Sequence, residues 1–185
     1  MSGFDTTLFQ WINSHHCTVA DWVLWCASQG WSWAVVLLAV FVICTLRREP
    51  GRWWLVLAGI ALCFLFADQL SATVFKPGFC RLRPCHALPD VRMFRTGCGG
   101  MYGFISSHAA NVVACATFLA MRYRKAALSW LMALWCLVVC YSRPYLGKHY
   151  PGDVVAGALV GFAIGATVCF IAAWAEGKIT SSSTK

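Results

Sequence analysis

Long apolar runs separated by short polar stretches dominate the chain. Five runs can be delimited, at residues 31–46, 53–75, 106–121, 126–141 and 154–175. A helix needs about 20 apolar residues to span the hydrocarbon core of a bilayer. The second and fifth runs have that length, and the other three need flanking residues or a locally thin bilayer. The pattern predicts an all-α fold, a polytopic transmembrane bundle of five spanning helices.

The first thirty residues have a different pattern. Apolar residues recur at helical spacing in two stretches, and Asp5, Asn13 and Asp21 interrupt them. We expect one or two amphipathic helices that lie at the membrane interface. The alternative is a sixth spanning helix that begins at Thr18 and is kinked at Gly30. No basic stretch precedes a small-residue cleavage site, so no removable signal peptide is predicted.

The predicted organisation therefore has three parts. These are an N-terminal interfacial segment, residues 1–30, a transmembrane domain, residues 31–176, and a polar cytoplasmic tail, residues 177–185. Gly157, Gly161 and Gly165 recur every four residues in the last run. Small residues at this spacing let another helix approach closely, so we expect them to serve packing.

Composition supports a membrane protein. Of the 185 residues, 59% are hydrophobic and 12% are charged, about half the charged share of soluble chains, and the mean hydropathy is +0.64. These values exclude a soluble, disordered or collagen-like chain. The net charge is +8, but the basic residues do not interleave with aromatic residues along a polar face. We therefore expect the lipid bilayer and an anionic substrate as partners, and no nucleic acid.

Basic side chains form two sets at opposite ends of the predicted helices. One set is Arg47, Arg48, Arg52, Arg122, Arg124, Lys125, Lys178 and Lys185, and the other is Lys76, Arg81, Arg83, Arg92, Arg95, Arg143 and Lys148. Three of the second set are assigned below to phosphate binding, which leaves eight against four. Because cytoplasmic loops carry an excess of Lys and Arg, we expect the second set and the N-terminus to lie outside.

Eleven cysteines are present. Eight lie in apolar or interfacial stretches, where cysteine behaves as a small hydrophobe. Cys80, Cys85 and Cys98 share the long outer loop. In an oxidising compartment one pair can form a disulfide, and we expect Cys85–Cys98. A zinc site is the alternative, but the spacing lacks a close Cys-x-x-Cys pair.

Three polar clusters lie at the outer ends of the predicted helices, at residues 76–84, 106–108 and 142–153. Lys76, Arg83 and Arg143 supply three cations, two of which match phosphate oxygens bidentately. Ser106 and Ser107 open a helix, whose free N–H groups and positive dipole end bind anions. The clusters therefore suit a phosphate group.

Histidines complete this inventory. His108 and His149 can divide the roles of nucleophile and acid near neutral pH. Asp153 follows His149 by four positions, and a carboxylate on Nδ1–H would leave Nε2 free to attack. No carboxylate cluster suited to Mg²⁺ is apparent, so we expect no metal and no other cofactor. The prediction is phosphoryl transfer through a phosphohistidine.

These clusters resemble the motifs of the type 2 phosphatidic acid phosphatase family, K-x6-R-P, P-S-G-H and S-R-x5-H-x3-D. Lys76 to Arg83-Pro84 matches the first motif, and Ser142-Arg143 through His149 to Asp153 matches the third. The second motif departs, because Ile105 replaces Pro and Ser107 replaces Gly. The resemblance spans about residues 53–175.

The resemblance implies roles for these residues. His149 would attack phosphorus while Asp153 orients it, and His108 would protonate the leaving oxygen and then help to activate water. The phosphate oxygens would be held by Lys76, Arg83, Ser106, Ser107 and Arg143. Vanadium-dependent haloperoxidases share this site, but a spanning architecture disfavours chemistry on soluble halides.

The expected function is that of an integral membrane lipid phosphatase in a bacterial inner membrane, with its site on the periplasmic face. Undecaprenyl diphosphate is favoured as substrate because an outward-facing site suits carrier recycling; lipid A 1-phosphate and phosphatidate-type or phosphatidylglycerophosphate lipids are alternatives. A lipid-binding or translocating protein without catalysis is a further alternative, disfavoured by the His149–Asp153 spacing. Asp68, an acid inside the second run, is a functional candidate that either pairs with a basic motif residue or bonds to a neighbouring helix. The oligomeric state stays open.

Overall fold

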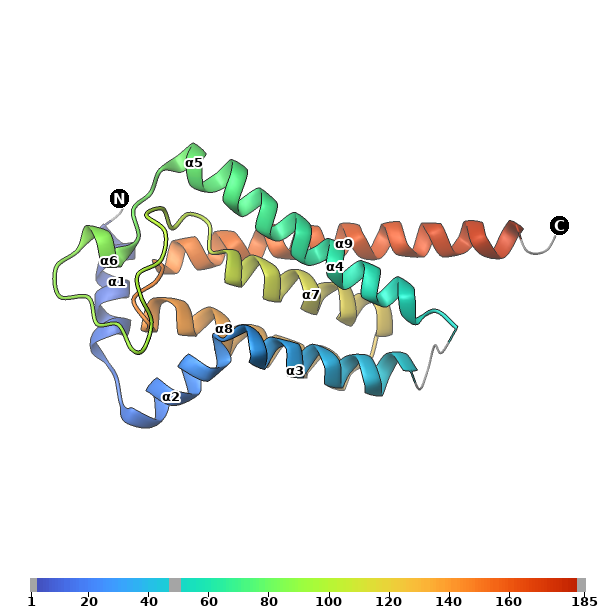
Figure 1. The fold of residues 1–185 in the computed structure, drawn as a ribbon, viewed down its shortest axis with the longest axis horizontal. Coiled ribbons are helices and arrows are strands. Elements are labelled where there is room, and N and C mark those ends of the chain that lie inside the picture. Colours follow the sequence, from blue (N-terminus) through green and yellow to red (C-terminus); the bar gives the residue numbers. More distant parts are fainter. Residues whose placement is uncertain (1–2, 47–50, 183–185) are drawn as a thin grey trace.

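Helices account for all the extended regular structure of the computed structural model, which describes residues 3–46 and 51–182 (Figure 1). In chain order they are α1 (Gly3–Ser14), α2 (Thr18–Ala27), α3 (Gly30–Val40), the π-helical η1 (Phe41–Leu46), α4 (Trp53–Gln69), the π-helical η2 (Leu70–Phe75), α5 (Lys76–Phe79), α6 (Pro84–Ala87), α7 (Ser107–Tyr123), α8 (Ala126–Tyr145) and α9 (Pro151–Ser182). Within these residues β pairing is limited to one isolated bridge, between Leu82 and Tyr102. The all-α prediction is confirmed, and each of the five apolar runs forms a helix.

Judged by helix length and composition, fewer helices can span a membrane than the sequence suggested. Among the described residues, three stretches are long and apolar enough, Trp53–Phe79, Ala126–Tyr145 and Pro151–Gly177. A fourth candidate is the pair of α2 and α3, which are bent by 64° at a short break. α7 is 17 residues long, shorter than the roughly 20 residues of a full span. The chain is an integral membrane protein, but five or six spans are not confirmed.

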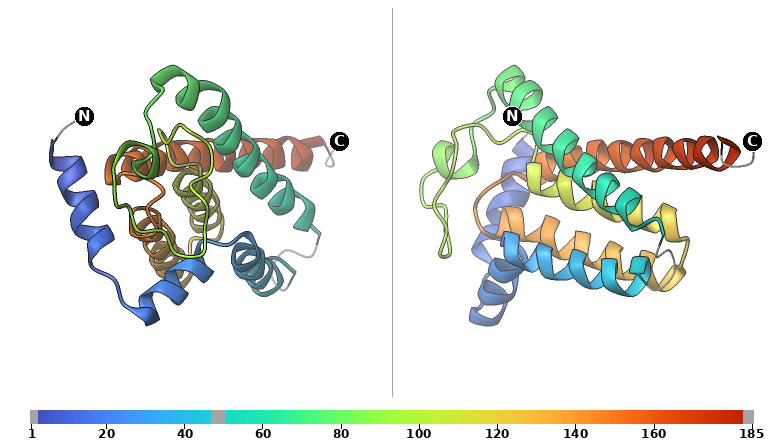
Figure 2. Two further views of the ribbon diagram at one scale, coloured as in Figure 1. Left: turned by 60° about the vertical axis from the view of Figure 1, so that its left-hand side comes forward. Right: turned by 45° about the vertical axis from the view of Figure 1, so that its right-hand side comes forward.

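Helix α7 lies in the middle of the bundle and packs against α4, α8 and α9 (Figures 1 and 2). Its alanines at 109, 110 and 114 are fully buried. On α9, a Cβ added at Gly157, Gly161 or Gly165 would lie 2.6, 2.3 or 2.3 Å from a carbonyl oxygen of α7. The packing role predicted for these glycines is confirmed, because no side chain fits between the two backbones.

The N-terminal helices lie at the loop end of the bundle. α1 runs across the bundle axis in Figure 1 and contacts α8 and α9. The Asn13 side chain donates to the carbonyl oxygens of Arg92 and Tyr145, both at 2.9 Å. Asp21 accepts from the Arg92 guanidinium at 2.5 Å and from the Tyr145 hydroxyl at 2.8 Å. The polar residues that interrupt the two amphipathic stretches thus fasten α1 and α2 to the long loop and to the end of α8.

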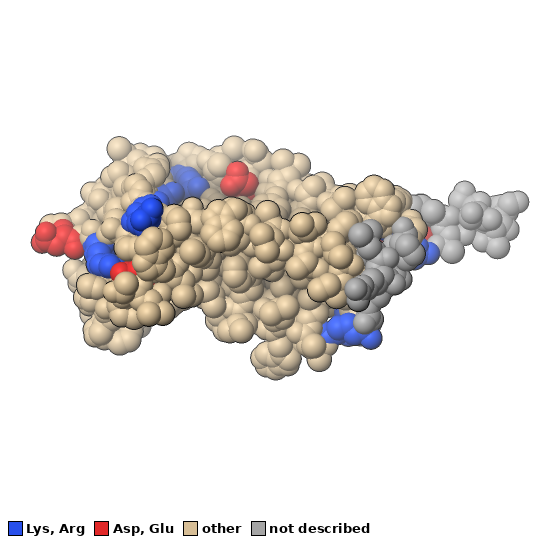
Figure 3. Space-filling model, turned by 60° about the horizontal axis from the view of Figure 1, so that its bottom comes forward, with Lys and Arg blue, Asp and Glu red and all other residues tan. Residues whose placement is uncertain are grey.

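The two basic sets lie at opposite ends of the bundle. At the end away from the loops, Glu176 accepts ion pairs from Arg122 at 2.6 Å and from Arg52 at 3.9 Å. Arg47, Arg48 and Lys185 lie outside the described residues, and α9 continues to Ser182 through the boundary predicted at residue 176. On the face in Figure 3, charged side chains gather mostly toward the loop end, and a broad uncharged area separates them from the opposite end.

Candidate active site

A cavity of about 460 Å³ opens at the loop end of the bundle, and the three polar clusters meet in it. Its charged and titratable lining consists of Lys76, Arg83, Arg143, Lys148, His108, His149 and Asp68. Ser107, at the start of α7, lines it as well. The first four N–H groups of a helix have no partner within it, so α7 directs a positive dipole end at this cavity.

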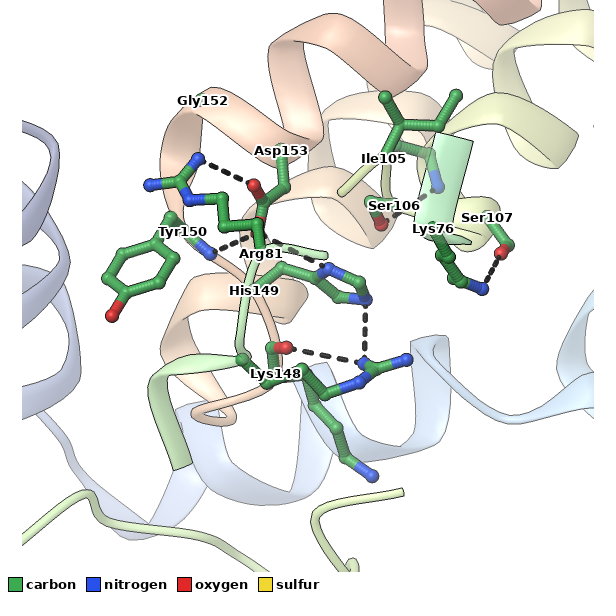
Figure 4. A network of polar contacts seen from close by, with 12 residues as sticks. Lys76, Arg81, Ile105, Ser106, Ser107, Lys148, His149, Tyr150, Gly152 and Asp153 are labelled. Atoms are coloured by element: carbon green, nitrogen blue, oxygen red, sulfur yellow. Dashed lines mark hydrogen bonds and ion pairs between the residues drawn. The ribbon is translucent and has the colours of Figure 1, made fainter. Parts of the chain in front are cut away.

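Lys76 reaches the start of α7. Its Nζ donates to the Ser107 hydroxyl at 2.7 Å, and the Ser71 hydroxyl lies 2.6 Å from the same oxygen (Figure 4). Ser71 belongs to η2 and is fully buried. The serine that replaces glycine in the second motif therefore holds the ammonium of the first motif in place.

Arg83 determines which nitrogen of His149 faces the cavity. The Arg83 NH1 group donates to His149 Nε2 at 3.0 Å, and Arg83 Nε donates to the Gly100 carbonyl at 2.7 Å. Since a guanidinium only donates hydrogen bonds, Nε2 is the acceptor and the proton of the neutral ring is on Nδ1. Burial, with Arg83 and Arg143 nearby, holds the pKa of His149 well below its usual range. The His149 ring is therefore neutral, and in this structure its Nε2 lone pair accepts from Arg83.

Asp153 lies behind His149, away from the cavity. Its Oδ2 is 3.7 Å from His149 Nδ1, too far for a hydrogen bond, and it accepts from the Tyr150 N–H at 3.0 Å. The predicted direct bond is thus absent from this structure, in which Asp153 is held by the Tyr150 N–H. Such contacts often tighten only when substrate binds, and the position of Asp153 suits an orienting role.

Two residues that the sequence did not assign to the site complete this arrangement. Arg81 donates to Asp153 Oδ1 at 2.6 Å and to Asp5 at 2.5 Å, and its guanidinium lies over the Tyr150 ring at 4.3 Å (Figure 4). Asp5 also accepts from the Gly152 N–H at 2.8 Å. The only signals were an acid that interrupts an amphipathic helix and an arginine inside the first motif. Helix α1 thus supports Asp153, behind His149, through Arg81.

Ser106, which the sequence suggested as a phosphate ligand, lies beside the cavity and does not line it in this structure. Ser106 is fully buried. Its hydroxyl caps α7 by accepting from the Ala109 N–H at 3.5 Å, and its own N–H donates to the Asp153 carbonyl at 3.0 Å. The helix begins directly after Ser106, so its side chain turns back to cap the helix while Ser107 faces the cavity.

Arg143 and Lys148, the other cations of the cavity, can bind an anion. Arg143 is 4% exposed, and its Nε has no hydrogen-bond partner in the described parts of the chain. A buried guanidinium without a carboxylate is costly, which indicates that its partner is a ligand. Lys148 also lines the cavity, and burial, with Arg143 and Arg83 nearby, lowers the pKa of Lys148 to about 8. His108 faces the cavity from α7, with its ring 5.4 Å from that of Trp33.

A disulfide holds the long loop over the cavity. Cys85 and Cys98 are joined, with their Cα atoms 5.9 Å apart, which is the pairing expected from the sequence. Their sulfurs lie close to the His86 ring, but bridged thiols cannot serve as the thiolate ligands that zinc requires. Cys98 and Gly99 line the cavity, so the bridge fixes one wall of the site.

The site can bind a tetrahedral anion next to a nucleophile. Arg83, Arg143 and Lys148 face the same space as His149 Nε2, and His108 lines that space from α7. A strong cationic environment stabilises the charge that develops in phosphoryl transfer. The arrangement fits transfer of a phosphoryl group to His149.

Comparisons with known proteins agree with this chemistry. A family model described as the PAP2 superfamily matches residues 52–177. The lipid A 4'-phosphatase of Porphyromonas gingivalis is 32% identical over 167 residues, which cover 87% of this chain and 70% of the relative. The lipid A 4'-phosphatase of Bacteroides thetaiotaomicron is 34% identical over 168 residues, which cover 87% and 73%.

Two solved structures have the same fold. LpxE of Aquifex aeolicus matches with a TM-score of 0.68 and 21% identity, over 90% of this chain and 94% of that one. A PAP2-type phosphatidylglycerolphosphate phosphatase of Bacillus subtilis matches with a TM-score of 0.68 and 16% identity, over 95% and 86%. At these identities the likeness concerns the fold alone.

Proposed function

Because this chain belongs to the PAP2 superfamily and is an integral membrane phosphatase, we propose that it removes the 4'-phosphate of lipid A through a metal-independent phosphohistidine intermediate. The observation that carries the mechanism is the bond from Arg83 to His149 Nε2, which leaves that nitrogen unprotonated beside the buried, unpartnered Arg143 Nε. A phosphate that enters the cavity supplies the hydrogen-bond acceptor that Arg143 lacks.

In the proposed reaction, Arg83 transfers its hydrogen bond from His149 Nε2 to an oxygen of the incoming phosphate. The freed Nε2 lone pair then forms a bond to phosphorus as the bond to the sugar oxygen breaks. His108 gives its proton to that leaving oxygen. The incoming phosphate brings negative charge beside His108, which favours the protonated ring that an acid requires. Water then attacks the phosphohistidine, His108 takes the proton of that water, and inorganic phosphate leaves.

The choice of substrate rests on the relatives. The sequence favoured undecaprenyl diphosphate, whereas both curated relatives reported above are lipid A 4'-phosphatases. We therefore place lipid A first and the prenyl diphosphate second. A phosphate on a lipid at the membrane surface can reach the cavity, because the cavity opens at the loop end of the spanning helices.

We further propose that the site faces the periplasm of a bacterial inner membrane. The disulfide at the loop end supports this orientation, because disulfides persist in oxidising compartments. The cluster of Arg122, Arg124 and Lys125 at the opposite end suits the cytoplasmic side.

The test is phosphate release from lipid A by the detergent-solubilised protein in EDTA, with mass spectrometry to locate the lost phosphate. We expect release from the 4' position, abolished by His149→Ala and unaffected by Gly177→Ala, which lies far from the site on α9. Millimolar vanadate, which mimics pentacoordinate phosphorus, should inhibit. Release that survives His149→Ala would refute the mechanism, and loss of the 1-phosphate alone would refute the assigned position.

A further inference from the structure

The cavity extends deeper into the bundle than its cations do. Asn111 follows His108 on the same face of α7, one turn farther from the loop end. On α4, Asp68 precedes Lys76 by eight positions, roughly 12 Å along a helix. Both residues line the same cavity as the catalytic histidines, together with Trp33 of α3. The cavity therefore has an outer cationic part and an inner part whose polar groups are an amide and a carboxylate.

Asn111 is a buried side chain with an unused acceptor. It is 9% exposed, and its Oδ1 has no hydrogen-bond partner among the residues that the structure describes. Buried polar atoms are nearly always paired, and an exception calls for an explanation. A ligand that donates a hydrogen bond to Asn111 Oδ1 inside the cavity would explain this unpaired atom.

Asp68 lines the cavity wall with an exposed side chain. Its charge acts on the Lys76 ammonium, but its carboxylate forms no hydrogen bond within the described part of the chain. An acid within a spanning helix is costly and marks a functional position. The carboxylate oxygens are therefore open to a ligand group that donates hydrogen bonds.

An ionised carboxylate only accepts hydrogen bonds, and an amide both donates and accepts them. The indole N–H of Trp33 is committed to the Ala27 carbonyl at 2.9 Å, so Trp33 adds an aromatic surface and no free donor. Hydroxyl and N-acyl groups of a sugar ring match this set. A prenyl chain offers no donor and would leave both acceptors unpaired.

We propose that Asp68 and Asn111 form a subsite that hydrogen-bonds the sugar attached to the scissile phosphate, and so select glycosyl phosphates over prenyl phosphates. This inference rests on the proposed function and adds the source of its selectivity. The sugar lies inward of the phosphate, so that its oxygen leaves toward His108. A site built to bond a substrate hydroxyl discriminates strongly against analogues that lack it.

The experiment compares kcat/KM for lipid A with that for undecaprenyl diphosphate, the competing prenyl phosphate, in one detergent. Asp68→Asn and Asn111→Leu are expected to lower kcat/KM for lipid A at least tenfold, and to change it less than threefold for the prenyl phosphate. Asp90→Asn is the matched control, since it removes the charge of an exposed loop acid that does not line the cavity.

The outcomes separate the two proposals. An equal loss on both substrates, with unfolding temperatures unchanged from the wild type, would overturn the sugar subsite while the phosphatase assignment stands. If either variant unfolds early, kcat/KM for Asp68→Glu decides, because a retained carboxylate should preserve most of the preference for lipid A. If the wild type releases no phosphate from lipid A, the proposed substrate itself is wrong.

Discussion

Replacing Gly161 by alanine introduces one methyl group where α9 and α7 are closest. The added Cβ would lie 2.3 Å from the Ala110 carbonyl oxygen and 3.0 Å from the Ala110 Cα. Both atoms belong to a helix backbone, so neither can rotate away as the tip of a side chain does. The helices must separate by about 1 Å to restore an ordinary contact distance.

The expected cost combines two effects. Overpacking of this kind destabilises the folded protein by about 1–3 kcal/mol. The higher helix propensity of alanine offsets about 0.5–1 kcal/mol of this. For a chain of this length, each kcal/mol lowers the unfolding temperature by about 2–4 °C. The separation also displaces Asp153, whose carbonyl accepts from the Ser106 N–H. Since a displacement of about 1 Å at a catalytic group can cost about 10²-fold, we expect kcat to fall 10- to 100-fold.

Gly177→Ala is the matched control, because it lies on the same helix with no atom within 4 Å of the added Cβ. Thermal unfolding in detergent and steady-state phosphate release are measured for both variants. We expect Gly177→Ala to unfold at or slightly above the wild-type temperature with full activity. If Gly161→Ala behaves in the same way, the close α7–α9 approach does not position the site, and the reasoning fails.

Three further predictions concern the site. Arg81→Gln should lower kcat about 100-fold, because it leaves the fully buried Asp153 carboxylate without its guanidinium partner. Arg81→Lys should retain part of the activity. A kcat within threefold of wild type in Arg81→Gln would contradict this role of Arg81. The pKa of Lys148 is about 8, so its side chain is charged below that pH and neutral above it. We therefore expect KM to rise as the pH increases through 8. In a pH–rate profile, Lys148→Arg should shift this rise to higher pH, and an unshifted rise would assign it to another group. Reduction of the Cys85–Cys98 bridge should remove about 3 kcal/mol of stability in the chain-entropy model and should raise KM. Thermal unfolding and kinetics are measured with and without dithiothreitol. An unchanged unfolding temperature after verified reduction would show that the bridge does not stabilise the fold.

The apolar runs and the polar clusters were accessible from the sequence because they depend on local patterns. The run at 126–141 forms α8, and the third motif places His149 just before α9 and Asp153 in its first turn. Spacing also indicated that Gly161 lies on a packing face. The fold class and the histidines therefore followed from residue order alone.

Contacts between distant segments were not accessible in this way. Arg81 joins Asp5 and Asp153, which are 76 and 72 positions away in the sequence, and no local pattern specifies such pairs. Spacing likewise did not distinguish Ser106 from Ser107, because the exact start of α7 decides which hydroxyl caps the helix and which faces the cavity.

By itself, the sequence determined that this protein lies in a membrane, that it is helical, and which cations and histidines are candidates for a phosphate site. Only the tertiary structure decided that Arg83 bonds to His149 Nε2, that Asp153 is held from behind through Arg81, and that Asp68 faces the cavity. The physical reason is that hydropathy and motif spacing act along one helix, whereas the direction of each side chain depends on how several helices pack together.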